Sequence, residues 1–279
     1  MKRSIHIKDT VLHLDTPQVM GILNVTPDSF SDGGKYDSLD SAMRHAEKMM
    51  RDGADILDIG GYSSRPGASE VSLLQELARV IPVVRKAARN LDVVISIDTF
   101  RSEVAQAAIE AGAHIVNDIS AGEDDSAMLD TVAKLRVPYI AMHKQGPPKT
   151  MQHNPTYGDV VKNVFDYLLA KKAECTAAGI RDIIIDPGFG FGKTQEHNYT
   201  LLRDFDKLQE IGTPILAGVS RKSMIYKYLK IAPEEAVNGS SFLHAFALQG
   251  GANILRVHDV REAVECVKLY GQLRSKNRT

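Results

Sequence analysis

The sequence predicts an α/β protein folded as a (β/α)8 TIM barrel, and three observations lead to that prediction. Short apolar runs alternate with longer segments of helical periodicity, as expected for parallel strands joined by helices. The length of 279 residues is close to the ~250 residues that one such barrel needs. Most apolar runs also end in a polar residue, and this fold places its chemistry at the carboxyl ends of its strands.

A β-hairpin is expected before the first barrel strand. Residues 4–7 and 11–14 alternate apolar and polar side chains around a polar turn at residues 8–10. Residues 1–18 would then form an N-terminal hairpin at the base of the barrel, where the amino ends of its strands lie.

Eight barrel strands and the helices between them account for the rest of the chain. The strands are expected at residues 19–24, 56–59, 93–97, 115–116, 139–142, 183–185, 215–219 and 254–257. The clearest helical segments are residues 38–54, 70–89 and 159–179. No Pro/Ser-rich linker, charge block or change in composition divides the sequence, so residues 1–279 are interpreted as a single domain.

The composition argues against several classes of protein. A formal net charge of −1, from 34 basic and 35 acidic residues, argues against binding of nucleic acid or of an acidic membrane surface. No run approaches the ~18 apolar residues that span a bilayer, and residues 1–10 lack the apolar core of an export signal. A cytoplasmic enzyme is therefore expected, with Cys175 and Cys266 as inert thiols.

Polar side chains at neighbouring strand ends suggest the first ligand. Asp98 and Asp186 each end an apolar strand, where a carboxylate is costly unless it is paired. Asn117 and Lys222 follow neighbouring strands, so the set offers acceptors and donors suited to a flat heterocycle held by its edge. Taken singly, Asp186 could instead open a turn before Pro187, and Asp98 could cap a helix.

Arg256 and His258 suggest a phosphate site. Strand periodicity places both on one face, about 6.6–6.8 Å apart, so each could bind one phosphoryl group of a diphosphate. Phosphate sites in this fold commonly use the loops after strands seven and eight, where Arg221 and Lys222 also lie. The alternative is an Arg256 paired with Asp259 and a His258 that caps a helix.

The glycine-rich run from Gly188 to Lys193 permits two interpretations. It differs by one residue from a nucleotide-binding P-loop, because Pro187 stands where that motif requires its first glycine. A mononucleotide-dependent phosphotransferase therefore remains an alternative. The other interpretation is that the glycines place Phe189 or Phe191 against an aromatic substrate, although Phe189 could equally belong to the core.

The run Gly-Ile-Leu-Asn-Val-Thr-Pro-Asp-Ser-Phe-Ser-Asp-Gly-Gly at residues 21–34 closely resembles the first signature of the dihydropteroate synthases, folate-pathway enzymes that sulfonamides inhibit. The similarity continues, in order, at residues 58–67, 97–99, 117–119, 142–146, 186–193, 220–223 and 256–260. It covers essentially the whole chain, and its first and last motifs are highly specific.

This resemblance implies a reaction and its ligands. The family joins 6-hydroxymethyl-7,8-dihydropterin diphosphate to p-aminobenzoate and releases diphosphate, with Mg²⁺ as cofactor and with sulfonamides as competitors. A homodimer is a further expectation from the resemblance. An apolar helical stripe that could form an interface, or could equally be core, consists of Phe242, Ala245, Phe246 and Leu248.

The resemblance also implies roles for individual residues. The pterin ring would be held by Asp98, Asn117, Met142, Asp186 and Lys222, with Asp98 also stabilising positive charge. The diphosphate would be bound by Arg256 and His258, with Asn24 as a ligand of the Mg²⁺. The p-aminobenzoate would lie between Phe30, Pro66 and Phe191, with its carboxylate at Ser223. Two further substrate-binding residues would come from a mobile loop, Ser64 and Arg65. The catalytic set would comprise Arg65, Asp98, Lys222, Arg256 and His258.

The second loop departs from the family pattern. Many relatives have Glu-Ser-Thr-Arg-Pro-Gly where residues 62–67 here read Tyr-Ser-Ser-Arg-Pro-Gly. Ser64 keeps a hydroxyl without the methyl group, and Tyr62 replaces a carboxylate, so loop geometry and sulfonamide sensitivity are in question. Two other functions are compatible with the same barrel fold. One is a pterin-binding methyltransferase domain, which has no diphosphate to release, and the other is a catalytically silent pterin-binding paralogue.

Overall fold

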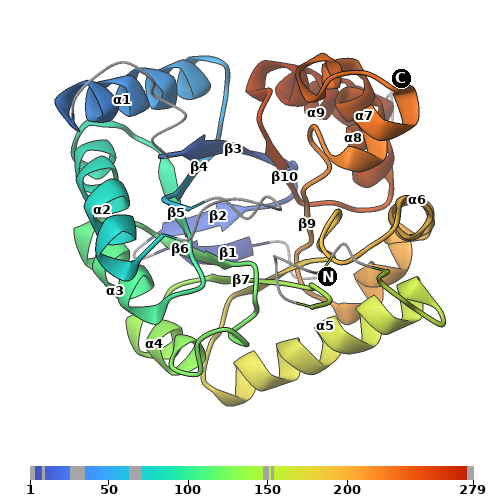
Figure 1. The fold of residues 1–279 in the computed structure, drawn as a ribbon, viewed down its shortest axis with the longest axis horizontal. Coiled ribbons are helices and arrows are strands. Elements are labelled where there is room, and N and C mark those ends of the chain that lie inside the picture. Colours follow the sequence, from blue (N-terminus) through green and yellow to red (C-terminus); the bar gives the residue numbers. More distant parts are fainter. Residues whose placement is uncertain are drawn as a thin grey trace, which may run out of the picture.

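The computed structural model describes residues 4–7, 10–25, 35–62, 71–146, 151 and 154–274, and it confirms the barrel (Figure 1). The barrel strands are β3 (Gln18–Asn24), β4 (Ile56–Gly60), β5 (Val94–Asp98), β6 (Ile115–Asp118), β7 (Tyr139–Met142), β8 (Ile183–Asp186), β9 (Leu216–Ala217) and β10 (Ile254–Val257). They form one parallel sheet in the order β8-β7-β6-β5-β4-β3-β10-β9. A parallel bridge between Ile185 and Ile215 joins its two outer strands, so the sheet closes on itself.

Helices surround the strands, as Figure 1 shows. The α-helices are α1 (Lys35–Arg51), α2 (Leu73–Asn90), α3 (Ser102–Ala111), α4 (Met128–Leu135), α5 (Val160–Ala177), α6 (Gln195–Arg203), α7 (Ser223–Leu229), α8 (Val237–Gln249) and α9 (Val260–Arg274). Short 3₁₀ segments cover Phe205–Ile211 and Pro233–Glu235. In the described part of the chain, no helix combines the length and the apolarity needed to cross a membrane.

Local chemistry sets several helix boundaries. The Ser72 side chain accepts a hydrogen bond from the Gln75 backbone N–H, while the Gln75 side chain accepts one from the Ser72 N–H, so a capping box begins α2. Asp159 caps α5 through the N–H groups of its first turn. The expected helix start at residue 38 was three residues late, because α1 begins at Lys35.

The predicted N-terminal hairpin is present and lies at the base of the barrel. Strand β1 (Ser4–Ile7) pairs antiparallel with β2 (Thr10–His13). Its apolar side chains Ile5 and Ile7, with Leu14, pack against residues from the beginnings of the barrel strands, a set made up of Met20, Ile56, Ile115, Ile140, Ile184, Leu216 and Ile254. The hairpin therefore covers the amino ends of the strands, and the carboxyl ends form the opposite face, called the mouth below.

Candidate active site

Arg256 connects three strands at the mouth. From β10 its Nε donates to Asp58 Oδ2 at 2.6 Å, and one terminal nitrogen donates to Asp98 Oδ2 at 2.5 Å. Asp58 on β4 is fully buried and also accepts a hydrogen bond from Asn117 Nδ2 of β6 at 3.0 Å. The guanidinium therefore holds two carboxylates at the centre of the mouth, and Asn117 completes the network.

Asp58 was missed by the sequence interpretation. It lies inside the apolar run that forms β4, and all five residues of this strand are buried. A charged residue within such a run was the available signal, because a buried carboxylate requires a partner. Its Oδ1 has no hydrogen-bond partner among the described residues.

Asp98 lies in a crowded ionic environment. Burial raises the pKa of its carboxyl group to about 7, Arg256 opposes this increase, and the neighbouring carboxylates of Asp58 and Glu76 add to it. A hydrogen bond from Tyr62 also favours the ionised form. Asp98 therefore titrates near neutral pH, which suits a group that exchanges hydrogen bonds with a polar ligand.

Asp186 and Lys222 approach the same mouth from β8 and from the turn after β9. Burial raises the pKa of Asp186, while the Gly188 backbone N–H, which donates to Oδ1 at 2.7 Å, and the Lys222 ammonium oppose the increase. Asp186 therefore does both things that the sequence suggested. It accepts the hydrogen bond that opens the turn after β8, and it lies close enough to Lys222 to interact with the ammonium group. Lys222 Nζ lies 4.4 Å from the centroid of the Phe191 ring, a cation–π contact that fixes the ammonium.

An apolar cluster borders these polar groups. Met142 and Phe191 pack with Ile119 and Met151, and Tyr62 lies against them. Phe189 instead stacks on Phe205 with ring centroids 6.0 Å apart, and it is almost completely buried. The interpretation of Phe189 as a core residue is therefore correct, and Phe191 is the aromatic residue of this loop that reaches the mouth.

The glycine-rich run packs against the loop after β7 and does not form a nucleotide site. A Cβ on Gly188 would lie 1.9 Å from the His143 carbonyl oxygen, and one on Gly192 would lie 2.3 Å from the Gln145 carbonyl oxygen. Lys193 is buried, and its Nζ contacts His143 Nδ1 at 2.9 Å and the Gly188 carbonyl oxygen at 2.9 Å. The Lys193 ammonium is therefore buried and hydrogen-bonded within the protein. In a P-loop the lysine would have to contact the nucleotide phosphates, so this arrangement argues against the phosphotransferase alternative.

The predicted phosphate-binding residues occupy two different environments. Arg221 forms a two-point ion pair with Asp259, at 2.9 and 2.5 Å, so Asp259 pairs with Arg221 and not with Arg256. His258 follows β10, and its Nδ1 lies 3.2 Å from Ser220 Oγ. Both guanidinium groups thus pair with carboxylates, Arg221 with Asp259 and Arg256 with two aspartates. Arg256 and His258 remain the candidates for diphosphate because both lie at β10, at the mouth.

Two further expected site residues lie at the ends of secondary-structure elements. Asn24 ends β3, is half-buried and pairs in register with Gly60 of β4. Ser223 is the first residue of α7 and follows Lys222. Four of the expected residues fall outside the described part of the chain: Phe30, Ser64, Arg65 and Pro66.

Glu76 is a second residue that the sequence interpretation missed. This fully buried carboxylate of α2 accepts a hydrogen bond from the Thr99 hydroxyl at 2.7 Å and forms an ion pair with Arg101. Thr99 and Arg101 follow Asp98, so Glu76 anchors the turn that carries Asp98 out of β5. The spacing of residues along a helix contains no signal for such a contact, because its partners come from another part of the fold.

Comparison with known proteins agrees with this geometry. The family model described as pterin binding enzyme matches residues 20–258. The dihydropteroate synthase of Escherichia coli strain K12 is 48% identical over 262 residues, covering 93% of each chain. A crystal structure of the Yersinia pestis dihydropteroate synthase with a sulfonamide drug complex has a TM-score of 0.92 at 45% identity, and it covers 98% of this chain and 99% of that one.

A structure of the Xanthomonas albilineans dihydropteroate synthase in complex with 7,8-dihydropteroate has a TM-score of 0.89 at 40% identity, with 98% and 99% of the two chains covered. Matches of this length and identity favour the dihydropteroate synthases over the methyltransferase and silent-paralogue alternatives. The chain therefore belongs to the pterin binding enzyme family and, within it, to the dihydropteroate synthases.

Proposed function

We propose that the mouth of this barrel condenses 6-hydroxymethyl-7,8-dihydropterin diphosphate with p-aminobenzoate to give 7,8-dihydropteroate and diphosphate, a step of folate biosynthesis. The amine nitrogen of p-aminobenzoate attacks the exocyclic methylene carbon, the bond from that carbon to the diphosphate oxygen breaks, and the amine loses a proton to solvent. The observation that carries the proposal is the cluster formed by Arg256 with Asp58 and Asp98, with Asn117 bonded to Asp58.

The polar cluster supports a role in holding the pterin ring. Asp98 and Asp186 supply carboxylate oxygens for ring N–H groups, and Asn117 and Lys222 supply donors for its carbonyl oxygen and ring nitrogens. Met142 borders them within the apolar cluster and suits the face of a flat ring. As the exocyclic C–O bond breaks, positive charge develops on the ring, and the Asp98 carboxylate is placed to stabilise it.

Arg256 and His258 are proposed to bind the diphosphate, together with Arg65 and Ser64. Asn24 is the proposed protein ligand of Mg²⁺, since its amide oxygen is a hard donor at the mouth end of β3. Among the described residues, no group of three or more His, Cys, Asp or Glu side chains could hold a metal ion, which fits an ion held largely by phosphate oxygens and water. When bound, Mg²⁺ would neutralise charge on the leaving diphosphate.

The second substrate is proposed to lie beside Phe191. The Phe191 ring lies at the edge of the mouth, in cation–π contact with the Lys222 ammonium. Ser223 follows Lys222 in the sequence and would bind the carboxylate of p-aminobenzoate. Phe30 and Pro66 would complete the walls of this site. Sulfonamides, which share the aromatic amine and an anionic group, are the expected competitors.

A coupled assay for released diphosphate tests the function. Release is expected only when the pterin diphosphate, p-aminobenzoate and Mg²⁺ are all present, and dihydropteroate should form in equal amount. Diphosphate release that does not depend on p-aminobenzoate would indicate a hydrolase, and binding of the pterin without release would indicate a silent paralogue.

Replacing Asp186 with asparagine is expected to weaken binding of 6-hydroxymethylpterin, which carries no diphosphate, by roughly 10- to 100-fold, since hydrogen bonds to charged groups are worth about 1.5–3 kcal/mol. The amide keeps the shape of the side chain but replaces one acceptor oxygen by a donor. Fluorescence titration measures the affinity, and Asp206→Asn on the surface is the matched control. An unchanged affinity in Asp186→Asn would remove this residue from the ring site.

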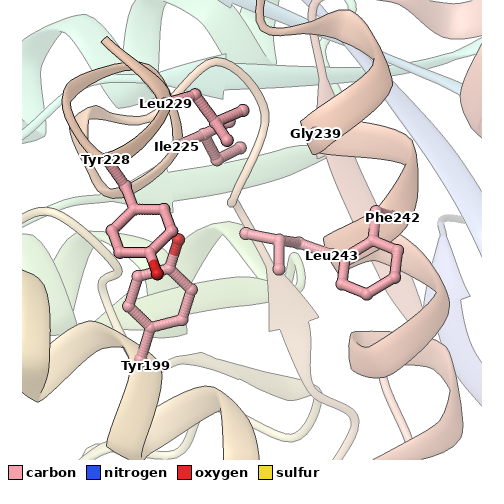
Figure 2. Close-up of a pocket in the computed structure, with 7 residues that line it drawn as sticks. All are labelled: Tyr199, Ile225, Tyr228, Leu229, Gly239, Phe242 and Leu243. Atoms are coloured by element: carbon pink, nitrogen blue, oxygen red, sulfur yellow. The ribbon is translucent and has the colours of Figure 1, made fainter.

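We also propose that the chain forms a homodimer through α6, α7 and α8. A hollow of about 350 Å³ is lined by Tyr199, Ile225, Tyr228, Leu229, Gly239, Phe242 and Leu243 (Figure 2). Phe242, which lines the hollow, is 63% exposed, and Phe246, one helical turn further along α8, is 48% exposed. Leu248 of the same predicted stripe is buried. A contiguous exposed apolar surface of this kind favours association, and a second copy offers the same surface.

Placing a carboxylate in this surface is expected to separate the subunits. Phe242→Glu would require burial of an unpaired charge between the two copies, so the protein should sediment as a monomer. Leu74→Glu is the control, because Leu74 is 77% exposed on α2, away from the hollow. Sedimentation velocity decides the question. A wild-type monomer, or a dimer that survives Phe242→Glu, would exclude this interface.

The compartment is the remaining part of the proposal. Both substrates are small polar molecules, and the described residues contain no helix suited to cross a membrane. We place the reaction in the cytoplasm.

A further inference from the structure

Tyr62 lies beside the pterin-ring site defined above, at a position where the sequence departs from many relatives. It follows β4 by two residues and is half-buried. Its hydroxyl donates to Asp98 Oδ1 at 3.4 Å, and its ring contacts Phe100 edge to face with centroids 5.1 Å apart. Tyr62 also packs against the apolar cluster that contains Met142 and Phe191.

The backbone that carries Tyr62 has little freedom. A Cβ on Gly61 would lie 2.7 Å from Val80 Cγ1 and 3.1 Å from Glu76 Cγ, so this glycine is pressed against α2. Arg79 of the same helix donates from its guanidinium to the Gly61 carbonyl oxygen at 2.9 Å. The direction in which the Tyr62 side chain leaves the strand is therefore set by packing that does not depend on a ligand.

The two oxygens of Asp98 have different donors. Arg256 donates to Oδ2 at 2.5 Å, and Tyr62 donates to Oδ1. The other charged groups that act on Asp98 are Asp58 of β4 and Glu76 of α2, both of which disfavour its ionised form. Because each carboxylate oxygen has two lone pairs, Oδ1 can accept from Tyr62 and still accept from an N–H group of a ligand.

We propose that Tyr62 is a positioning residue for Asp98: its hydroxyl donates a hydrogen bond that stabilises the ionised carboxylate, and its ring, held by Phe100, forms an apolar edge of the pterin-ring site. A carboxylate at position 62, as in many relatives, would add a further negative charge beside Asp98. The phenol instead supplies a neutral donor. This inference rests on the role proposed above for Asp98 in holding the ring.

The test is the pH dependence of 6-hydroxymethylpterin binding, measured by fluorescence titration between about pH 5 and pH 8.5, on both sides of the Asp98 pKa of about 7. Loss of the Tyr62 hydroxyl removes a donor that favours ionised Asp98, so the pKa of Asp98 rises further and a higher pH is needed for binding. In Tyr62→Phe the midpoint should move up by about 0.5 pH unit, as expected for one long hydrogen bond. Affinity at the alkaline end should change by less than about twofold, because Asp98 is ionised there in both proteins.

Tyr167→Phe is the matched control, because that hydroxyl donates to the Glu123 carboxylate at 2.8 Å, outside the mouth cluster, and its loss should leave the midpoint unchanged. Phe100→Leu removes the ring that holds Tyr62 and should move the midpoint in the same direction as Tyr62→Phe. An unmoved midpoint in Tyr62→Phe, or an equal loss of affinity at every pH, would overturn the inference.

Asp98→Asn separates this inference from the proposed role of Asp98. Asparagine does not ionise, so in that variant the affinity for 6-hydroxymethylpterin should no longer change with pH around the Asp98 pKa. If the dependence persisted, Asp98 would not be the group that binds the ring, and the inference would fail together with that assignment. If it disappeared while Tyr62→Phe behaved like the wild type, only the role of Tyr62 would be wrong.

Discussion

Replacing Arg256 with alanine is expected to lower the turnover number by roughly 10²–10³-fold, the scale of losing one preorganised donor to a developing anion. In the structure this guanidinium also neutralises two carboxylates, Asp58 and Asp98, of which Asp58 is fully buried. Its loss leaves these charges without their cation, which costs about 3–5 kcal/mol of unfolding free energy for a buried pair. Arg256→Ala should therefore impair both activity and stability.

Steady-state diphosphate release and urea unfolding measure the two effects of Arg256→Ala separately. Arg256→Lys should recover part of the stability but little of the turnover, because an ammonium cannot donate along the two directions that the guanidinium uses. Arg261→Ala is the control, since that arginine forms an exposed ion pair with Glu265 on α9. Near-normal turnover in Arg256→Ala would refute its assignment to the leaving diphosphate.

Replacing Glu76 with alanine is expected to lower the free energy of unfolding by about 3–5 kcal/mol, because it breaks a buried ion pair from one side and leaves a cavity. The carboxylate is fully buried, and both of its oxygens are used, by Thr99 and by Arg101. Activity should fall as well, since these two partners belong to the turn that follows Asp98.

Urea unfolding checks the stability effect of Glu76→Ala. Glu76→Gln should lose less stability, because the amide oxygen can still accept one of the two hydrogen bonds. Glu103→Ala, at an exposed position in the first turn of α3, serves as the control. A loss below about 1 kcal/mol in Glu76→Ala would mean that Arg101 turns to water without cost, and the anchoring role would be wrong.

The architecture could be predicted because apolar runs and helical periodicity are local properties. Strands β3, β7 and β10 agree with the expected ranges to within one residue at each end. Strand β9 is shorter than the expected range 215–219, since Leu216–Ala217 pairs with β10 and Ile215 adds a single bridge to β8. Apolar character predicts burial, whereas the extent of a strand is set by pairing with its neighbour.

Several residues that lie at the mouth could be named from the sequence, but the contacts between them could not. Asp98 and Asp186 could be named because each ends a strand, and this fold brings those ends together. Asn117 and Lys222 could be named because they lie near the carboxyl ends of β6 and β9. Arg256 was expected to face a diphosphate, and nothing local indicated that it would also bridge Asp58 and Asp98. Such pairings join residues up to 198 positions apart, so they follow from the closed sheet and not from any segment of sequence.

The hairpin at the base of the barrel has a consequence for the order of assembly. Ile5 and Ile7 precede every barrel strand in the sequence, yet the apolar cluster to which they belong includes Ile254, in the last strand of the barrel. This cluster cannot be complete until β10 has been synthesised. Contacts over such a sequence separation form slowly, and apolar surface left uncovered meanwhile favours aggregation. The hairpin is thus made before every barrel strand but is among the last elements to be fully packed, and a chain that stops before β10 would leave it only partly covered.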